Sequence, residues 1–319
     1  MEYRNLGRSG LRVSAVGLGC NNLSRPGTAT ESQEGTTAVV DAALDSGVNF
    51  FDTAEMYGVA FGASESRLGA ALAGRRDAAV IATKFGHTDI PSQIEGWGAK
   101  ASRRYIRLAV EGSLRRLQTD WIDLYQLHTP NPLVPIEETL AALGELIDEG
   151  KIRYIGHSNF AAWQLVEAEY IARELGSERF ISAQNEYSLL VRGAERELFP
   201  AADRFGVGFL PFYPLYNGVF TGKYSRQGGP EDSRIMQRRP QLLETVPWDA
   251  VDAFAAFAAD RGITMLEATV GWLLSHSGVS SVIAGATTPE QISQNAAAGT
   301  AWIPSPDEVE QIEELFPLA

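Results

Sequence analysis

Short apolar runs recur along the whole chain, and most of them are separated by stretches in which apolar residues have a helical spacing. The runs are rich in β-branched residues and show little alternation of polar and apolar positions. This is typical of strands whose two faces are both covered. Eight runs have this character, at 13–19, 50–52, 79–84, 121–128, 152–158, 179–184, 207–212 and 281–285.

Two of the intervening segments have a clear helical pattern. The segment 135–149 begins with a proline and an acidic first turn and ends before Gly150, as expected of a helix. The segment 102–118 has apolar residues at intervals of four, four and three positions, which gives a helix one apolar face. These residues are Ile106, Val110, Leu114 and Leu117.

Eight strands that alternate with helices predict a closed parallel barrel of the (β/α)8, or TIM-barrel, type. An open doubly wound sheet is the alternative. The opening segment, 3–14, has the pattern of a short β-hairpin with a Gly/Ser turn. We find no repeat, low-complexity tract or linker and therefore expect a single domain over 1–319. Two long stretches, 86–101 and 216–247, have no regular pattern, and loops of this length often bind or cover ligands.

Composition and charge narrow the class of protein. The 319 residues are 45% hydrophobic and 21% charged, which is ordinary for a globular chain. A net charge of −13 argues against nucleic acid as a partner, although a local pocket can still bind a small anion. The chain has no apolar run long enough to span a membrane and no signal-peptide pattern at its start. Because Cys20 is the single cysteine, we expect a cytoplasmic protein without disulfides.

Reactive side chains occur where the predicted strands end. Asp52 ends the second strand and Tyr57 follows it in the next loop, while Lys84 ends the third strand and His128 ends the fourth. In a barrel of this type the carboxyl ends of the strands form the catalytic rim. The sequence therefore predicts these four side chains on one rim. The fifth and sixth strands add polar residues to the same rim, namely Ser158, Asn159 and Gln184.

These four residue types suit the reduction of a carbonyl group. A carbonyl that accepts hydride becomes an alkoxide and needs a proton, which Tyr57 can supply, although a phenol with a pKa of about 10 is a weak acid. Lys84 favours the phenolate by as much as about 4 kcal/mol at roughly 4 Å and an effective dielectric of 20. Asp52 would hold Lys84 in place, and His128 can donate a hydrogen bond to the carbonyl oxygen.

Each of these residues also has a structural interpretation when it is considered alone. Asp52 can cap a turn, Tyr57 can pack on the rim, Lys84 can be a solvated charge and His128 can be a hydrogen-bonded structural histidine. Their joint occurrence at one barrel end favours the catalytic interpretation. We expect no metal, because the histidines lack the spacing of ligands. The histidines are His87, His128, His157 and His276.

Six motifs in order resemble those of the aldo-keto reductases: FFDTAEMYG, IATKFG, DWIDLYQLH, GKIRYIGHSNF, AQNEYSLL and GATTPEQISQN. The resemblance covers about 3–315 and is closest to a bacterial branch that also resembles potassium channel β subunits. It implies a (β/α)8 barrel whose N-terminal hairpin closes the bottom, and NADPH-dependent reduction of aldehydes or ketones. It also implies that Asp52, Tyr57, Lys84 and His128 are the family's catalytic tetrad, with Tyr57 as the general acid.

The resemblance also implies the cofactor contacts. Ser158, Asn159 and Gln184 match the residues that hydrogen-bond the nicotinamide amide. Phe212 stands where the family usually has a tyrosine that stacks on the nicotinamide, and Tyr213 stands where it has a serine. Two further segments match those that hold the pyrophosphate (Leu215, Gly218, Thr221 and Lys223) and the adenosine phosphate with the adenine (Gly285, Thr287, Gln291 and Asn295).

One departure from the family pattern concerns the choice of cofactor. Relatives commonly have Arg or Lys at the place of Thr288, where the cation pairs with the 2′-phosphate of NADPH, and Gln294 replaces the usual glutamate. Loss of the cation removes a contact worth about 1.5–3 kcal/mol. We therefore expect NADPH to be used, with NADH possible and discrimination modest. GATTPEQ also opens a helix after the eighth strand, which suits a phosphate but equally suits an ordinary capped helix.

The substrate is not defined by the sequence, and neither are the direction of flux or the oligomeric state. An aromatic, apolar cleft is expected from the candidate wall residues Asn21, Tyr57, Phe85, Trp97, His128 and Tyr216. Trp97 is interpreted either as a lid over the substrate or as a rim-packing residue. The GLGC segment at 17–20 lacks the third glycine of a dinucleotide-binding fingerprint, and Cys20 is more simply a small buried residue than a redox sensor.

The sequence is also compatible with two other functions. One is a regulatory subunit in which the bound dinucleotide reports the redox state with little turnover. The other is a barrel lyase or hydrolase that uses Asp52 and His128 and needs no cofactor.

Overall fold

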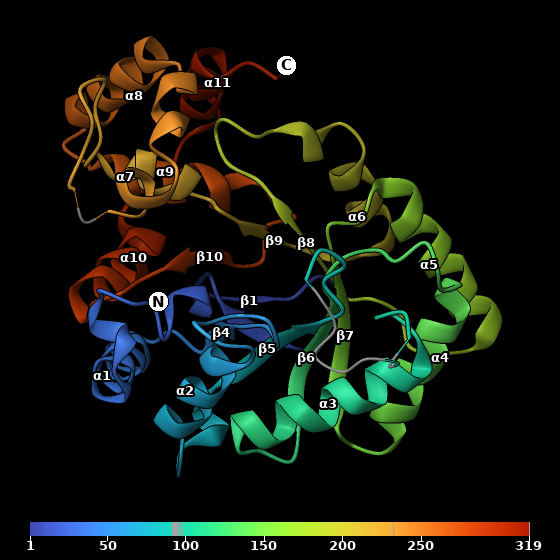
Figure 1. Ribbon diagram of the computed structural model, residues 1–319. Helices are drawn as coiled ribbons and strands as arrows, with labels where there is room; N and C mark the ends of the chain where they lie inside the picture. The colour runs from blue at the N-terminus through green and yellow to red at the C-terminus, as the bar shows by residue number, and fades with distance from the viewer. Residues whose placement is uncertain (91–95, 97, 232, 319) are drawn as a thin grey trace.

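Eight parallel strands form the centre of the molecule in the computed structural model, which describes residues 1–90, 96, 98–231 and 233–318 (Figure 1). Their order in the sheet is β10-β3-β4-β5-β6-β7-β8-β9, so strands β3 to β9 lie side by side in chain order, and the last strand, β10, pairs with the first, β3. All eight predicted strands are confirmed. They are β3 (Val16–Gly19), β4 (Phe50–Asp52), β5 (Val80–Phe85), β6 (Ile122–Leu127), β7 (Ile152–Ser158), β8 (Ser182–Glu186), β9 (Gly208–Phe212) and β10 (Val282–Gly285).

The ring of strands closes between β9 and the residues just before β10. The amide of Phe209 donates to the carbonyl of Gly278 at 2.8 Å, and the amide of Ser280 donates to the carbonyl of Phe209 at 2.9 Å. Since β10 also pairs with β3, the first and last strands of the sheet are joined. The predicted TIM barrel is confirmed, and the open doubly wound alternative is wrong.

Helices surround the barrel on its outside, mostly between consecutive strands (Figure 1). The predicted helix at 102–118 is α3, in which Ser102 caps the first turn by accepting from the amide of Tyr105. The predicted helix at 135–149 is α4. The helices are α1 (Gln33–Asp45), α2 (Ala63–Ala71), α3 (Arg103–Leu117), α4 (Ile136–Asp148), α5 (Ala162–Leu175), α6 (Leu198–Phe205), α7 (Arg234–Arg238), α8 (Trp248–Asp260), α9 (Met265–Ser275), α10 (Pro289–Ala301) and α11 (Pro306–Leu315).

One of the two stretches expected to be irregular is partly helical. The segment 216–247 contains the short helix α7 and two 3₁₀ helices, η5 (Tyr216–Thr221) and η6 (Pro240–Thr245). Helices this short carry too few turns for an apolar period to emerge from the sequence. The other 3₁₀ helices are η1 (Cys20–Asn22), η2 (Ala29–Glu31), η3 (Arg76–Ala78) and η4 (Gly193–Glu195).

The predicted N-terminal hairpin, β1 (Tyr3–Asn5) with β2 (Arg12–Ser14), lies across the amino-terminal end of the barrel. Leu6 and Val13 of this hairpin are fully buried and pack into the barrel interior. The hairpin therefore closes the bottom, as expected, and leaves the carboxyl ends of the strands as the end where chemistry can occur. The interior residues that these two side chains join are Phe50, Ala82, Leu124, Leu210 and Ile283.

Successive residues of a barrel strand alternate between the interior and the layer under the helices. Phe50 belongs to the interior cluster, whereas its neighbour Phe51 packs in the larger cluster beneath the helices. Both faces are apolar, which explains why the strands show so little polar alternation. In the part of the chain that the structure describes, no helix has the length and apolar character needed to cross a bilayer.

Candidate active site

Lys84 lies at the centre of a buried polar group at the carboxyl end of the barrel. Its Nζ is 2.7 Å from Oδ2 of Asp52 and donates to the carbonyl of Thr53 at 2.8 Å. The same nitrogen is 3.4 Å from the hydroxyl of Tyr57. The lysine side chain is fully buried, and that of Asp52 is nearly so. Strands β4 and β5 are adjacent and parallel, which is why residues far apart in sequence meet here.

The carboxylate of Asp52 is held by partners on three other strands. Oδ2 accepts from Lys84, while Oδ1 accepts from Nε2 of Gln184 at 2.9 Å and from Nε2 of Gln126 at 3.4 Å. A buried ion pair is stable only when its remaining polar atoms are also satisfied. The network therefore fixes the position of the ammonium that faces Tyr57.

The phenol of Tyr57 experiences opposing effects. Burial raises its pKa most, the ammonium of Lys84 lowers it, and Asp52 raises it again, so that the net pKa lies above the ordinary value. Lys84 acts in the direction expected from its charge, but burial outweighs it. Burial also lowers the pKa of Lys84, yet Asp52 and Tyr57 more than offset this and raise the net pKa. At neutral pH the pair is thus a neutral phenol beside an ammonium.

His128 follows β6 and faces Tyr57 across the rim. The two rings are 5.8 Å apart in an edge-to-face arrangement. Burial, together with the nearby Lys84 and His87, holds the pKa of His128 well below its usual value. The imidazole is therefore neutral at physiological pH. Its Nδ1 is buried and, among the described residues, has no hydrogen-bond partner.

Two residues that support this site were not predicted from the sequence. Gln126 contacts Asp52 from β6, and the signal for it was present, because Gln126 and His128 are two residues apart and so share the inner face of the strand. Glu55 accepts from the amide of Gly86 at 2.8 Å and from the hydroxyl of Tyr105 at 2.9 Å. These bonds fasten the loop that carries Tyr57 onto the end of β5 and onto α3.

The residues assigned to the cofactor lie along the other half of the rim. Ser158 and Asn159 follow one another at the end of β7, and Asn159 Nδ2 donates to the carbonyl of His128 at 2.9 Å. Gln184 is on β8 and Phe212 ends β9. Because β7, β8, β9 and β10 are consecutive in the barrel wall, the assigned positions form a continuous arc beside the tetrad.

A family model matches almost the whole chain. It is that of the aldo/keto reductase family, and it matches residues 15–316. The chain belongs to the aldo/keto reductase family. Like the members of that family, it is an NAD(P)H-dependent oxidoreductase.

Several named relatives match this chain over almost its full length. A probable voltage-gated potassium channel subunit beta of Oryza sativa subsp. japonica is 35% identical, with 98% of this chain and 96% of the relative covered. The uncharacterized oxidoreductase YrpG of Bacillus subtilis (strain 168) is also 35% identical, with coverages of 92% and 89%. The L-glyceraldehyde 3-phosphate reductase of Escherichia coli (strain K12) is 32% identical, with coverages of 98% and 92%.

The loop after β9 of this aldo/keto reductase has a strained backbone. The φ angles of Tyr213, Tyr216 and Asn217 are 51°, 44° and 56°, values that residues other than glycine rarely adopt. Gly218 follows at 98°. Such strain persists at sites where a loop must take one shape to contact a ligand. The residues of the arc therefore fit a nicotinamide dinucleotide, with aromatic and hydrogen-bonding groups at β7–β9 and this loop next to them.

The start of α10 is capped by its own side chains. Thr288 accepts from the amide of Gln291 at 3.3 Å, and Oε1 of Gln291 accepts from the amide of Thr287 at 2.8 Å. Hydrogen bonds with its own backbone amide and with Thr288 lower the pKa of Glu290. A carboxylate thus stands in the first turn where the family places the adenosine phosphate. Asn295 is buried one turn further along and reaches the carbonyl of Gly285 at 3.5 Å.

The remaining residues that the family resemblance assigns to the pyrophosphate belong to the strained loop or lie next to it. Leu215 is buried at the start of η5, and Thr221 closes this helix by donating to the carbonyl of Gly218 at 2.7 Å. The ammonium of Lys223 lies 5.3 Å from the centre of the Tyr224 ring.

The structure brings only part of the expected substrate wall to the rim. Asn21 belongs to η1 directly after β3, and Tyr216 begins η5 after β9. Phe85 does not line a cleft, because it is fully buried under the helices and stacks on Tyr125 at 4.6 Å. Strand alternation explains this placement, since an inward Lys84 sends the next residue outward. Trp97 lies outside the described residues.

Cys20 is buried at the start of η1. Burial is the main cause that raises the pKa of its thiol far above the usual value, and Asp52 adds to the effect. A protonated, inaccessible thiol is a poor nucleophile and a poor redox sensor. The simpler interpretation, a small residue packed at a strand end, agrees with this environment.

Proposed function

We propose that the protein reduces aldehydes or ketones to alcohols, with Tyr57 as the proton donor to the carbonyl oxygen. The observation that carries the proposal is the fully buried Lys84–Asp52 pair, whose ammonium lies 3.4 Å from the phenol of Tyr57. Burying two charged groups carries a large desolvation penalty. The pair lies at the end of the (β/α)8 barrel where catalytic residues are found, which favours a catalytic role for it.

Tyr57 and Lys84 divide the work of proton transfer. Burial keeps the resting phenol protonated, so the proton is available at neutral pH. As negative charge develops on the substrate oxygen, the proton moves to it and charge appears on the tyrosine oxygen. Lys84 is already positioned to stabilise that charge in a water-poor environment, where a preorganised cation is most effective. Asp52 keeps the ammonium oriented and charged.

His128 orients the carbonyl group. A neutral imidazole has one N–H to donate, and the low pKa of His128 ensures that the ring carries no competing positive charge. A hydrogen bond to the carbonyl oxygen directs that oxygen toward the phenol across the 5.8 Å that separates the two rings. The nicotinamide dinucleotide, when bound along the arc from β7 to β10, supplies the hydride.

A panel of carbonyl compounds tests this proposal directly. Aldehydes, diketones and sugars are to be assayed with NADPH and with NADH, and the oxidation of the cofactor is monitored. We expect turnover of at least one class. Quenching of tryptophan fluorescence by the cofactor without turnover of any compound would instead support a regulatory role, as the name of the rice relative suggests. Absence of both turnover and cofactor binding would contradict the proposal.

We further propose that NADPH is used with only modest preference over NADH. Thr288 offers no cation to a 2′-phosphate, and Glu290 places a carboxylate in the same helical turn. We expect less than a thousandfold difference in kcat/KM between the two cofactors.

Replacing Thr288 by arginine is predicted to raise the NADPH-to-NADH ratio of kcat/KM by about ten- to a hundredfold, because a charge-assisted contact contributes about 1.5–3 kcal/mol. Thr300→Arg adds the same charge at the exposed far end of α10 and serves as the matched control. An equal rise in both variants, or no rise in Thr288→Arg, would show that this turn does not face the 2′-phosphate.

A further inference from the structure

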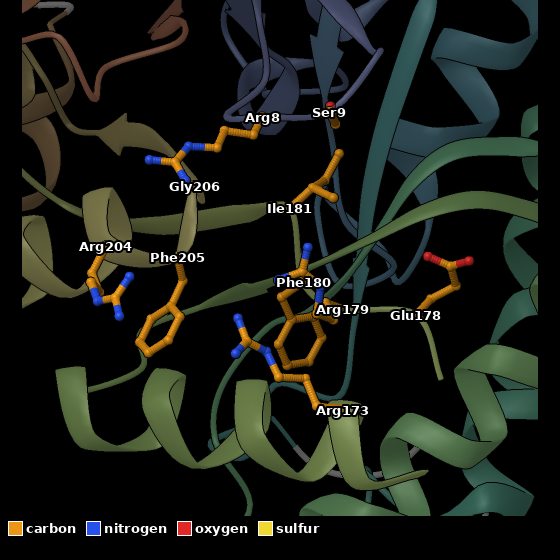
Figure 2. Close-up of a pocket in the computed structure, with 10 residues that line it drawn as sticks. All are labelled: Arg8, Ser9, Arg173, Glu178, Arg179, Phe180, Ile181, Arg204, Phe205 and Gly206. Carbon is orange, nitrogen blue, oxygen red and sulfur yellow. The ribbon is translucent and has the colours of Figure 1, made fainter. Parts of the chain in front are cut away.

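A cavity of about 350 Å³ opens at the amino-terminal end of the barrel, away from the tetrad. Its lining includes Phe180 and Ile181, which precede β8, and Gly206, which precedes β9. All strands of the barrel are parallel, so residues that precede a strand lie at the amino-terminal end, whereas Asp52 and Lys84 lie at the carboxyl end. Figure 2 shows the side chains around the cavity, which come from the hairpin turn, from α5, from the segment before β8 and from the end of α6.

The charge of this cavity is opposite to that of the protein. Four arginines and one glutamate line it, although the chain as a whole has a net charge of −13. Charges of one sign that line a recess focus the electrostatic field there and attract a ligand of the opposite charge. The charged lining residues are Arg8, Arg173, Arg179, Arg204 and Glu178.

Two of the arginines are fixed in place by one buried carboxylate. Oε1 of Glu169 accepts from Nε of Arg173 at 2.7 Å and from Nη1 of Arg179 at 2.6 Å. Glu169 has a side-chain exposure of only 2%, whereas the two arginines are about half exposed, at 51% and 46%. The guanidinium of Arg173 also lies 5.7 Å from the ring of Phe205. One carboxylate for two guanidinium groups leaves net positive charge in a preorganised geometry.

The hairpin turn supplies the third arginine through a close approach of backbones. The amide of Arg8 donates to the carbonyl of Gly206 at 2.8 Å, and the side chain of Arg8 crosses directly over this glycine. A Cβ at position 206 would lie 2.4 Å from Cδ of Arg8, so only glycine permits the crossing. Gly206 has a φ of 72° and ends α6, the helix whose last turn carries Arg204.

Among the residues that the structure describes, Arg8 and Arg204 have no carboxylate partner. Neither forms an ion pair with any residue that the structure describes; the guanidinium of Arg8 reaches only the carbonyl of Asp203, at 3.5 Å, and that of Arg204 lies 6.0 Å from the Phe205 ring. Their positive charges are therefore available to a ligand.

We propose that this cavity binds a small molecule that carries a diphosphate group, at a site separate from the active site. Guanidinium groups bind phosphate oxygens in a bidentate manner, and several arginines around one recess match a multiply charged anion better than a carboxylate. The volume lies at the lower end of the range for small-molecule sites, which suits a compact phosphorylated ligand.

Isothermal titration calorimetry with pyrophosphate tests the proposal on protein saturated with reduced cofactor, which keeps the dinucleotide site occupied. We expect one binding site for pyrophosphate. Arg8→Gln and Arg204→Gln should each weaken this binding about tenfold or more, because each removes a charge-assisted contact. Arg104→Gln, an exposed arginine on α3, should leave the Kd unchanged. Titrations with inorganic phosphate and with ADP show whether one phosphate suffices and whether a nucleoside adds affinity.

The two cavity variants should fold normally, because neither arginine forms an ion pair within the described part of the chain, and equal Tm values would verify this. Equal Kd values in Arg8→Gln, Arg204→Gln and the control would overturn the proposal, as would the absence of pyrophosphate binding. Inorganic phosphate that binds as tightly as pyrophosphate would contradict the diphosphate assignment. Carbonyl reduction is not the readout, so either result leaves the proposed function to be tested by the substrate panel.

Discussion

Replacing Tyr57 by phenylalanine is expected to lower kcat/KM for carbonyl reduction by at least about a hundredfold while the Kd for reduced cofactor stays unchanged. The substitution removes the hydroxyl that lies 3.4 Å from the ammonium of Lys84 and keeps the ring that faces His128. It thus deletes the proton donor without deleting a cofactor contact. The loss should appear in kcat, because the phenol acts on charge that develops only in the transition state.

Initial rates and fluorescence titration of the cofactor measure the two quantities separately. Tyr154→Phe is a suitable control, since Tyr154 lies on β7 with its hydroxyl near Gly10 of the hairpin, at the other end of the barrel. Near-normal turnover of Tyr57→Phe would remove Tyr57 from its assigned role. A parallel loss of cofactor binding would mean that the residue shapes the dinucleotide site.

Replacing Lys84 by methionine should also reduce carbonyl reduction by about a hundredfold or more and should change its pH dependence. The ammonium lowers the pKa of the Tyr57 phenol, so its removal raises that pKa further. The acid form of Tyr57 is the active one, and kcat/KM for reduction falls as pH rises through this pKa. The fall should therefore move to higher pH in the variant. An unchanged pH–rate profile would show that Lys84 does not tune the phenol.

The same substitution leaves Asp52 as an uncompensated buried carboxylate, which typically costs about 3–5 kcal/mol of stability. A second variant, Lys84→Met combined with Asp52→Asn, removes both charges and should recover most of the lost Tm. If this double variant melts like the wild type but remains inactive, the loss of activity belongs to the site and not to the fold. Recovery of activity would contradict the assigned role of Lys84.

Most of the fold was predictable because its signals are local. Each strand is a short apolar run bounded by polar residues, and alternation with helices restricts eight such runs to few topologies. The proximity of Asp52, Tyr57, Lys84 and His128 was predictable for the same reason. Asp52 and Lys84 end apolar strands, where a charge is unusual unless it has a partner, and the barrel topology brings strand ends to one rim.

Other features depend on packing that the sequence does not display. Phe85 packs under the helices because its neighbour Lys84 points into the barrel, and the sequence alone does not show which residues of β5 point inward. The pKa of Tyr57 depends on a balance between burial and the charge of Lys84, and only coordinates give the burial. The arginine-lined cavity is assembled from four separated segments that no sequence period connects.

A double-mutant cycle tests most directly whether the phenol and the ammonium act as one unit. It requires kcat/KM for reduction by the wild type, Tyr57→Phe, Lys84→Met and the variant with both substitutions. If Lys84 acts through Tyr57, the combined variant should be no slower than the slower single variant, within about threefold, because residues that act as a unit are strongly non-additive. Two losses that multiply would show that the residues act independently and would contradict the proposed proton donor.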